Sequence, residues 1–162
     1  MNKKCLGVLA VLLCLFTIPA SAATVSFMMV ETGLRDEAEA TRYGSLWEGS
    51  LMEAFFNAGH IVTNSPIARM EVRPEPLGSE LEADLDEALF GGAQYFVLGF
   101  LEYVNQPGIP VPSMITIEIY NTGSRELIYK QEFAAGAGRT LSEEDRIAQE
   151  AGRIMVLHIE NR

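Results

Sequence analysis

The hydrophobic pattern of this chain changes its period several times, and each change predicts a different element. Residues 24–31 are β-branched or apolar at successive positions, which is typical of a strand covered on both faces. Within residues 41–58 the apolar positions instead recur at the spacing of one helix face: Trp47, Leu51, Ala54, Phe55 and Ala58. Gly59 supplies the left-handed residue that ends many helices, and residues 60–63 are predicted to form a second strand.

The middle of the chain is predicted to be a long connection followed by a short helix. Residues 64–78 contain Pro66, Pro74, Pro76 and Gly78, so we expect an irregular segment with at most a short strand or turn around residues 68–72. Ser79 to Glu82 has the spacing of a capping box. An apolar stripe follows and ends at two glycines: Leu81, Leu85, Ala88, Leu89, then Gly91 and Gly92. The second helix therefore has both a start and a stop.

The next segments predict a central strand and a hairpin. Residues 93–104 are the most apolar stretch outside the N-terminus, which favours a strand in the middle of a sheet. Residues 114–120 alternate isoleucine with other residue types, and this pattern predicts a half-buried strand whose outer face is wet. Turn-forming residues and a second alternating segment complete an antiparallel hairpin over residues 113–134.

A last helix is expected to open at Ser142, with Asp145 three residues later and an acidic first turn, 143–145, that lies in water. Its inner stripe is predicted to be Ile147, Ala151, Ile154, Met155 and His158. The fold class that follows is α/β, a single mixed β-sheet with helices in the order β-α-β-α-β-β-β-α.

Residues 1–22 are predicted to be a signal peptide. Lys3 and Lys4 precede an apolar run, and Ala20, Ser21 and Ala22 are small residues of the kind that a signal peptidase needs. The apolar run, residues 5–18, is shorter than the roughly 20 residues that span a bilayer. We therefore expect an exported protein, in the bacterial periplasm, whose residues 23–162 form a single α/β domain.

Cysteine usage and charge exclude several functions. Acylation at Cys14 is not favoured, because bulky Leu13 stands where lipoprotein signals carry a small residue. Cys5 and Cys14 both lie in the predicted signal peptide, so the remaining chain cannot form disulfides, iron–sulfur clusters or thiolate zinc sites. The chain has 12 basic and 22 acidic side chains, and this acidic excess leaves no basic surface to which a nucleic acid could bind.

The candidate chemistry is sparse. His60 is expected at a helix-to-strand junction, where it donates to a backbone carbonyl, and His158 on the last helix. The acidic run at residues 82–87 lies on a predicted helix face in water, and Arg139 beside the glycine-rich residues 136–138 is only a weak anion site. Zincin, EF-hand and nucleophile-elbow motifs are absent from the sequence. We therefore predict no catalytic, cofactor or metal site.

One connection is a candidate for contact with a partner. It lies between two predicted strands and is stiff, apolar and rich in proline: Pro107, Ile109, Pro110, Val111 and Pro112. It is either a wide hairpin loop or a preformed extended ridge that docks on a partner with little entropy to lose.

A family resemblance rests on four features: the strand at 25–30, the helix and glycine at 46–59, the glycine pair with the apolar segment that follows it at 91–99, and a hairpin followed by a C-terminal helix. Together they resemble the periplasmic α/β domain shared by curli-secretion lipoproteins, penicillin-binding-protein activator lipoproteins and the N-terminal domain of the Tol translocation protein. The resemblance implies a noncatalytic envelope protein that binds other proteins or assembles into complexes. The chain departs from these groups in lacking a convincing lipobox and a long insert for a membrane-spanning hairpin, and no site residue carries over.

Our hypothesis is an exported, noncatalytic cell-envelope binding or accessory protein that contacts envelope proteins, with self-association left open. Two alternatives stand beside it. A small carboxylate-dependent enzyme acting on glycans would need a buried carboxyl pair roughly 5 to 9 Å apart in a cleft. A small-ligand carrier would need a closed apolar pocket beneath residues 95–103.

Overall fold

The computed structural model describes residues 22–34, 41–74, 79–104, 110–136 and 138–162. Of the predicted signal peptide only Ala22 belongs to these ranges, so that prediction lies outside the described residues. The same holds for residues 105–109 of the proline-rich connection.

The described elements confirm the α/β class with one mixed sheet. In chain order they are β1 (Thr24–Thr32), α2 (Thr41–Asn57), β2 (Ile61–Asn64), β3 (Ala68–Met70), α3 (Ser79–Phe90), β4 (Tyr95–Tyr103), β5 (Pro112–Asn121), β6 (Leu127–Ala134) and α4 (Leu141–Glu160). The predicted order lacked β3, which the sequence showed only as a short strand or turn. Pro66 has no amide to donate, and it falls between β2 and β3, so one edge of the sheet is built from two short strands.

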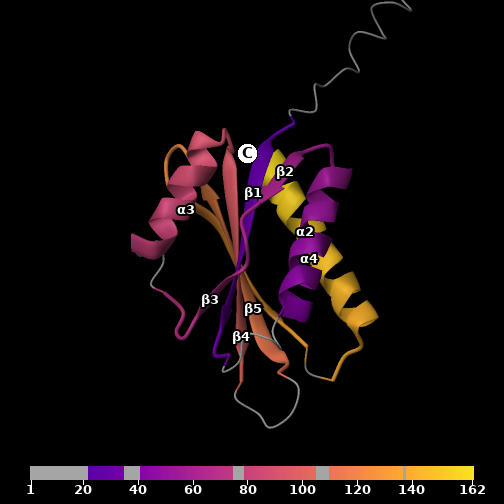
Figure 1. Ribbon diagram of the computed structural model, residues 1–162. Coiled ribbons are helices and arrows are strands. Elements are labelled where there is room, and N and C mark those ends of the chain that lie inside the picture. The colour runs from indigo at the N-terminus through magenta and orange to yellow at the C-terminus, as the bar shows by residue number, and fades with distance from the viewer. Residues whose placement is uncertain (1–21, 35–40, 75–78, 105–109, 137) are drawn as a thin grey trace, which may run out of the picture.

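The strands follow the order β2-β1-β4-β5-β6, and β3 also pairs with β1. β1 is parallel to β2, β3 and β4, whereas β5 and β6 extend the sheet as an antiparallel hairpin. Figure 1 shows α2 and α4 side by side on one face of this sheet and α3 on the other. β1 and β4 are therefore covered on both faces, as their continuous apolar sequences predict.

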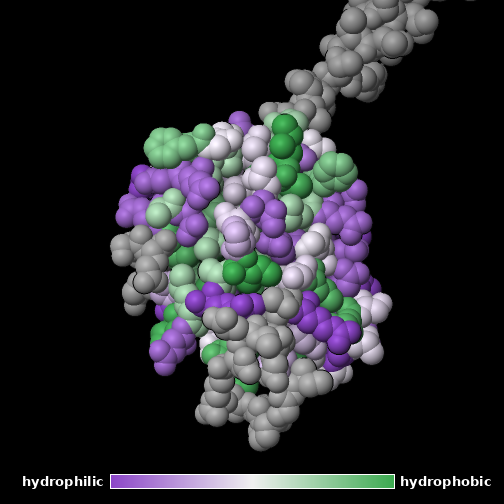
Figure 2. Space-filling view, in the orientation of Figure 1, coloured by the Kyte–Doolittle hydropathy of each residue, from purple (hydrophilic) through white to green (hydrophobic). Residues whose placement is uncertain are grey.

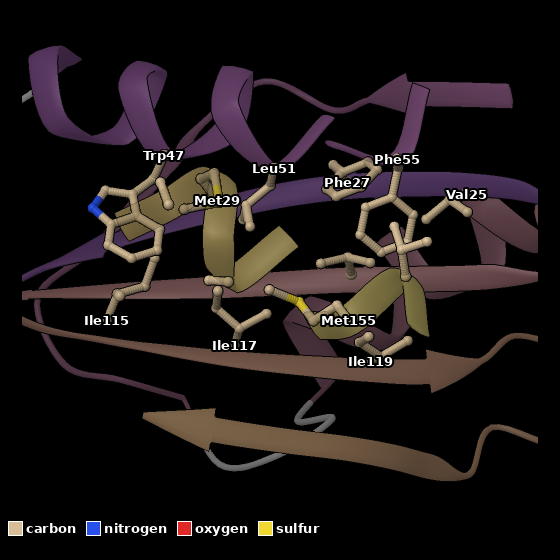
Figure 3. Close-up of a cluster of buried hydrophobic side chains, with 14 of the residues drawn as sticks. Val25, Phe27, Met29, Trp47, Leu51, Phe55, Ile115, Ile117, Ile119 and Met155 are labelled. Atoms are coloured by element: carbon tan, nitrogen blue, oxygen red, sulfur yellow. The ribbon is translucent and has the colours of Figure 1, made fainter. Parts of the chain in front are cut away.

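The larger core lies between the sheet and the helix pair α2 and α4. Trp47, Leu51 and Phe55 from the predicted stripe of α2 are fully buried and point at the strands (Figure 3). The rings of Phe27 and Phe55 meet edge to face with centroids 5.2 Å apart. Met155 of α4 completes this layer.

The first turn of α4 corrects an expectation. Glu144 is fully buried, not in water, because its carboxylate accepts hydrogen bonds from Trp47 Nε1 at 2.9 Å and from the Gly136 amide at 3.0 Å. Arg139 adds an ion pair at 3.3 Å from Nη1 to Glu144 Oε2. Trp47 of α2 and the segment just before α4 thus supply the donors that this buried carboxylate needs. Arg139 binds Glu144 within the fold instead of an external anion.

The start and the phase of α4 also differ from the prediction. Thr140 is the N-cap: its Oγ1 accepts from the Glu143 amide at 3.3 Å, and Glu143 Oε2 accepts from the Thr140 amide at 2.8 Å. Asp145, expected in the cap with Ser142, instead accepts a hydrogen bond from Ser50 Oγ at 2.6 Å. Ile154 is 39% exposed, because α4 packs against both α2 and the sheet and its buried side is turned away from that residue.

The helices α2 and α4 are in closest contact at Gly152. A β-carbon at this position would lie 2.5 Å from Ala54 Cβ and 3.5 Å from the Leu51 backbone. The helices run parallel, since Trp47 contacts Glu144 near their starts and the exposed Glu160 approaches His60 beyond the end of α2. Glycine at 152 therefore sets how closely the two axes approach.

This contact yields a stability prediction. Gly152→Ala should destabilise the protein by about 1 to 3 kcal/mol, since the added methyl group overlaps Ala54 and outweighs the gain in helix propensity of up to about 1 kcal/mol. Gly49→Ala is the matched control: it lies inside α2 with no atom within 4 Å of an added β-carbon, and it should stabilise by roughly 0.5 to 1 kcal/mol. Urea denaturation measures both variants, and equal shifts would contradict the close contact.

Candidate functional site

The second face of the sheet is only partly covered by a helix. Leu81, Leu85 and Ala88 of α3 pack on the apolar part of this face. Beyond them the sheet presents Thr116, Glu118 and Tyr120, the residues that were expected to form a wet outer face. That expectation is wrong, because all three are buried.

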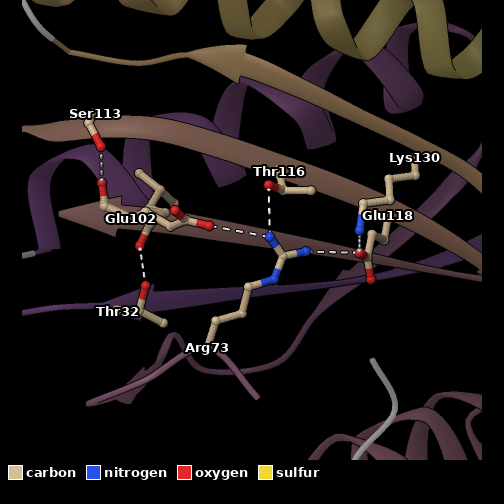
Figure 4. Close-up of polar contacts among 8 residues, drawn as sticks. Thr32, Arg73, Glu102, Ser113, Thr116, Glu118 and Lys130 are labelled. Carbon is tan, nitrogen blue, oxygen red and sulfur yellow. Dashed lines mark hydrogen bonds and ion pairs between the residues drawn. The ribbon is translucent and has the colours of Figure 1, made fainter. Parts of the chain in front are cut away.

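The cover over these residues is the side chain of Arg73, from the connection that follows β3. Its Nη1 donates to Glu102 Oε1 at 3.2 Å and to Thr116 Oγ1 at 3.0 Å (Figure 4). Its Nη2 donates to Glu118 Oε1 at 2.9 Å. The guanidinium also stacks on Phe100, with 4.4 Å from Cζ to the ring centroid. One arginine thus closes a patch of sheet that no described helix covers.

Glu118 is the centre of this polar cluster. Lys130 Nζ of β6 lies 2.9 Å from its Oε1, and the Tyr120 hydroxyl donates to its Oε2 at 2.6 Å. Burial, together with this bond, raises the pKa of Tyr120. The buried carboxylate is therefore compensated by two cations and a phenol, and removing one of these partners would leave its charge under-compensated.

A second buried carboxylate lies on the helix-pair face. Glu31 of β1 is fully buried, accepts from the Tyr103 hydroxyl at 3.0 Å and pairs with Arg69 Nε at 3.3 Å. A side chain at Gly44 of α2 would crowd it, since a β-carbon there would lie 2.7 Å from Glu31 Oε1. Burial raises the pKa of Glu31, and the bonds from Tyr103 and Arg69 oppose part of that rise.

Glu48, one turn further along α2, is half-buried. Burial raises the pKa of Glu48 as well, and a hydrogen bond with Asn64 partly offsets the rise. Its Oε1 has no hydrogen-bond partner among the described residues. This is the one acidic oxygen of the described chain that is both buried and unbonded.

The two histidines lie apart and hold structural contacts. His60 sits at the predicted junction, but its Nδ1 accepts from the Ala23 amide at 3.2 Å instead of donating to a carbonyl, because the start of β1 passes beside it. His158 Nε2 lies 3.0 Å from the Ile128 carbonyl oxygen. Within the described ranges, no group of three or more His, Cys, Asp or Glu residues could hold a metal ion.

The acidic run on α3 is largely solvated, as expected, except that Asp84 is half-buried and burial, with the charge of Glu87, raises its pKa. Glu82 and Asp86 pair with Arg125 at 2.6 and 2.5 Å, and all three side chains are well exposed. These two ion pairs connect α3 to the β5–β6 turn.

The molecule also has a groove between α2 and α4, with a volume of about 410 Å³. It is lined by Glu53, Ala54, Asn57, Ala58, Gln149, Arg153, Val156 and Leu157. Leu157 is 58% exposed, and two further apolar side chains, Phe56 and Ile61, are exposed where α2 ends and β2 begins. Figure 2 shows hydrophobic surface at this end of the molecule. None of the lining comes from β4, so the groove is not the pocket that a carrier would have beneath residues 95–103.

The predicted partner loop is only partly described. Pro107 and Ile109 lie outside the described residues, Pro110 and Val111 are half-buried, and Pro112 is buried as the first residue of β5. The docking role of this loop stays a prediction. Sequence periodicity gave no sign of the groove, because the pairing of α2 with α4 depends on contacts between residues far apart in the chain.

Several solved structures are similar to this chain, although neither family models nor curated proteins match it. The PelC dodecamer from Paraburkholderia phytofirmans aligns over 88% of this chain and 91% of its own, with a TM-score of 0.50 and 15% identity. TolB from Acinetobacter baumannii aligns over 85% of this chain and 27% of its own, with a TM-score of 0.40 and 12% identity. The LpoB C-terminal domain from Salmonella enterica covers 76% and 90%, with a TM-score of 0.38 and 14% identity.

These similarities concern the fold. Of the three, the PelC alignment, at a TM-score of 0.50, supports the α/β fold that the sequence resemblance implies. Of the helices in the described ranges, none offers the long apolar stretch that crossing a membrane takes.

The polar cluster yields a second stability prediction. Arg73→Met leaves Glu118 buried with one cation fewer and should cost about 3 kcal/mol or more. Arg125→Met removes an arginine that also bridges two carboxylates, but at the surface, and should cost less than about 1 kcal/mol. Denaturation in urea compares the two, and adding Glu118→Gln to Arg73→Met should recover part of the loss. Equal costs for the two arginine variants would show that the cluster is not tightly coupled.

Glu31 yields a prediction about pH. Burial raises the pKa of Glu31 above the ordinary value of 4.5, so the folded state holds this proton more tightly than the unfolded state. The free energy of unfolding therefore falls as the pH rises from the ordinary pKa to the raised one. Glu31→Gln removes the titration. Relative to wild type, the variant should therefore gain stability as the pH rises from about 4 to 8. Unfolding free energies measured across this range test the sign, and a difference that does not vary with pH would refute it.

Proposed function

We propose that this protein is an exported, noncatalytic cell-envelope accessory protein that works by binding other proteins. The predicted signal peptide supports the export and the envelope location. The compensation of Glu31, Glu118 and Glu144 by cations and hydrogen bonds supports a noncatalytic role, because acid–base chemistry on a glycan needs carboxyl groups that a substrate can reach.

The observation that carries the proposal is the groove between α2 and α4. Its floor is apolar, with Ala54, Ala58 and Val156, and Leu157 stands exposed at its side. Glu53 and Arg153 bring opposite charges to the rim. A parallel helix pair with small residues at its seam suits a third helix, so the occupant we propose is an amphipathic helix of an envelope protein whose apolar residues meet Leu157.

The rim charges add a chemical requirement to that occupant. A partner helix that lies in the groove would place a basic residue near Glu53 and an acidic residue near Arg153. Because both rim side chains are exposed, these pairs would govern orientation and the rate of encounter more than affinity.

The test is photo-crosslinking in the native envelope, with a photoreactive residue at Gln149 on the groove wall. We expect a discrete crosslinked partner whose yield falls sharply when Leu157→Glu places a charge in the groove. Phe90→Glu is the control, since Phe90 is 87% exposed on α3 at the opposite face and the same change should leave the yield unaltered. Equal losses with both variants, or no partner together with glycan cleavage by the purified protein, would refute the proposal.

A further inference from the structure

The last strand of the sheet, β6, has an outer edge with no strand beside it in the part of the chain that the structure describes. On its inner side the Ala135 amide donates to the Ser113 carbonyl at 3.1 Å, and Gln131 is paired with Ile117. Residues of a strand turn their backbone groups alternately to one side and the other. Lys130 and Glu132 therefore turn their N–H and C=O groups toward the open edge.

Both ends of this edge are closed by side chains from α4 and from the residues just before and after it. The Ile128 carbonyl accepts from Arg162 Nη2 at 3.3 Å and lies 3.0 Å from His158 Nε2. At the other end the Ala134 carbonyl accepts from Arg139 Nη1 at 2.6 Å. The backbone groups of Lys130 and Glu132 have no partner among the described residues. What remains open is a short window in the middle of the strand.

The side chains at this window are complementary to themselves. Lys130 and Glu132 lie on the face of Glu118, and Tyr129, Gln131 and Phe133 lie on the other. If a second β6 runs antiparallel with a two-fold axis at Gln131, Lys130 of each copy faces Glu132 of the other. The same register sets Tyr129 opposite Phe133 on the other face.

Neighbouring registers are worse. Moving the two-fold axis by one residue places Lys130 opposite Lys130, or Glu132 opposite Glu132, and like charges that face each other across strands are destabilising. The charges thus select one register, and the closed carbonyls of Ile128 and Ala134 stop the ladder from growing beyond it.

We propose that two copies of this chain pair edge to edge through β6, antiparallel, with the two-fold axis at Gln131. Lys130 already lies 2.9 Å from Glu118, so Glu132 of the second copy would continue an alternating row of charges from the polar cluster across the interface (Figure 4). Such an isologous contact closes on itself, and an open strand edge gains partners for its bare backbone groups. With so short a ladder, the dimer should be weak and dependent on concentration.

A cysteine scan tests the register in the full chain, with Cys5 and Cys14 replaced by serine and the protein recovered from the envelope. In Gln131→Cys the two thiols face each other at a site where Cα atoms are about 4.5 Å apart, within disulfide reach, so mild oxidation should yield a linked dimer. In Tyr129→Cys the thiols are four residues out of register, roughly 13 Å apart, and should not link. No dimer from Gln131→Cys, or equal yields from both variants, would overturn the proposal.

A charge reversal separates specific pairing from chance collision. Glu132→Lys, added to Gln131→Cys, sets like charges against each other twice and should lower the dimer yield roughly tenfold. Glu126→Lys makes the same charge change in the exposed turn before β6 and should leave the yield as it was. Melting curves that match the parent confirm that both variants fold. A crosslink indifferent to Glu132→Lys would show that the charges do not set the register.

Discussion

The structure depends on the burial of β1 and β4 from both sides. These two parallel strands carry apolar residues on both faces, so both faces of the sheet must be covered by other parts of the chain. The two faces are covered to different extents. The pair α2 and α4 covers one face, whereas α3 covers only part of the other. The guanidinium of Arg73 closes the remainder by lying on Phe100 and binding the carboxylates beneath it. The polar cluster is thus a consequence of how much sheet a short helix can cover.

The helix pair follows from the same requirement. Gly152 lets α4 approach α2 closely, and the bond from Trp47 to Glu144 fixes the two helices at their starts. Past the contact at Gly152, their outer surfaces leave a groove with an apolar floor. The close packing that completes the core on the inner side of the pair therefore shapes a surface on its outer side. This is why the proposed binding role belongs to the helices and not to the buried carboxylates.

Local pattern predicted most elements of this fold, and it failed where burial is decided by a distant partner. The strand at β1, the helix around Trp47 and the β5–β6 hairpin follow from period and turn residues alone. Glu118 and Glu144 looked solvated, because the donors that make their burial tolerable, Arg73 and Trp47, stand 45 and 97 residues away in sequence. The groove was missed for the same reason. β3, at three residues, is too short for any period to show.

The contacts of His60 bring together parts of the chain that are far apart in sequence. Its ring accepts from the amide of Ala23, at the start of β1, and its other nitrogen lies 3.8 Å from Glu160, at the end of α4. The first strand and the last helix therefore begin and finish at the same pole of the molecule, where Figure 1 places the C-terminus beside β1. A short linker could join these two points, with new ends opened in the turn between β5 and β6. Such a circular permutant would keep every strand neighbour, and β6 and α4 would be synthesised first instead of last.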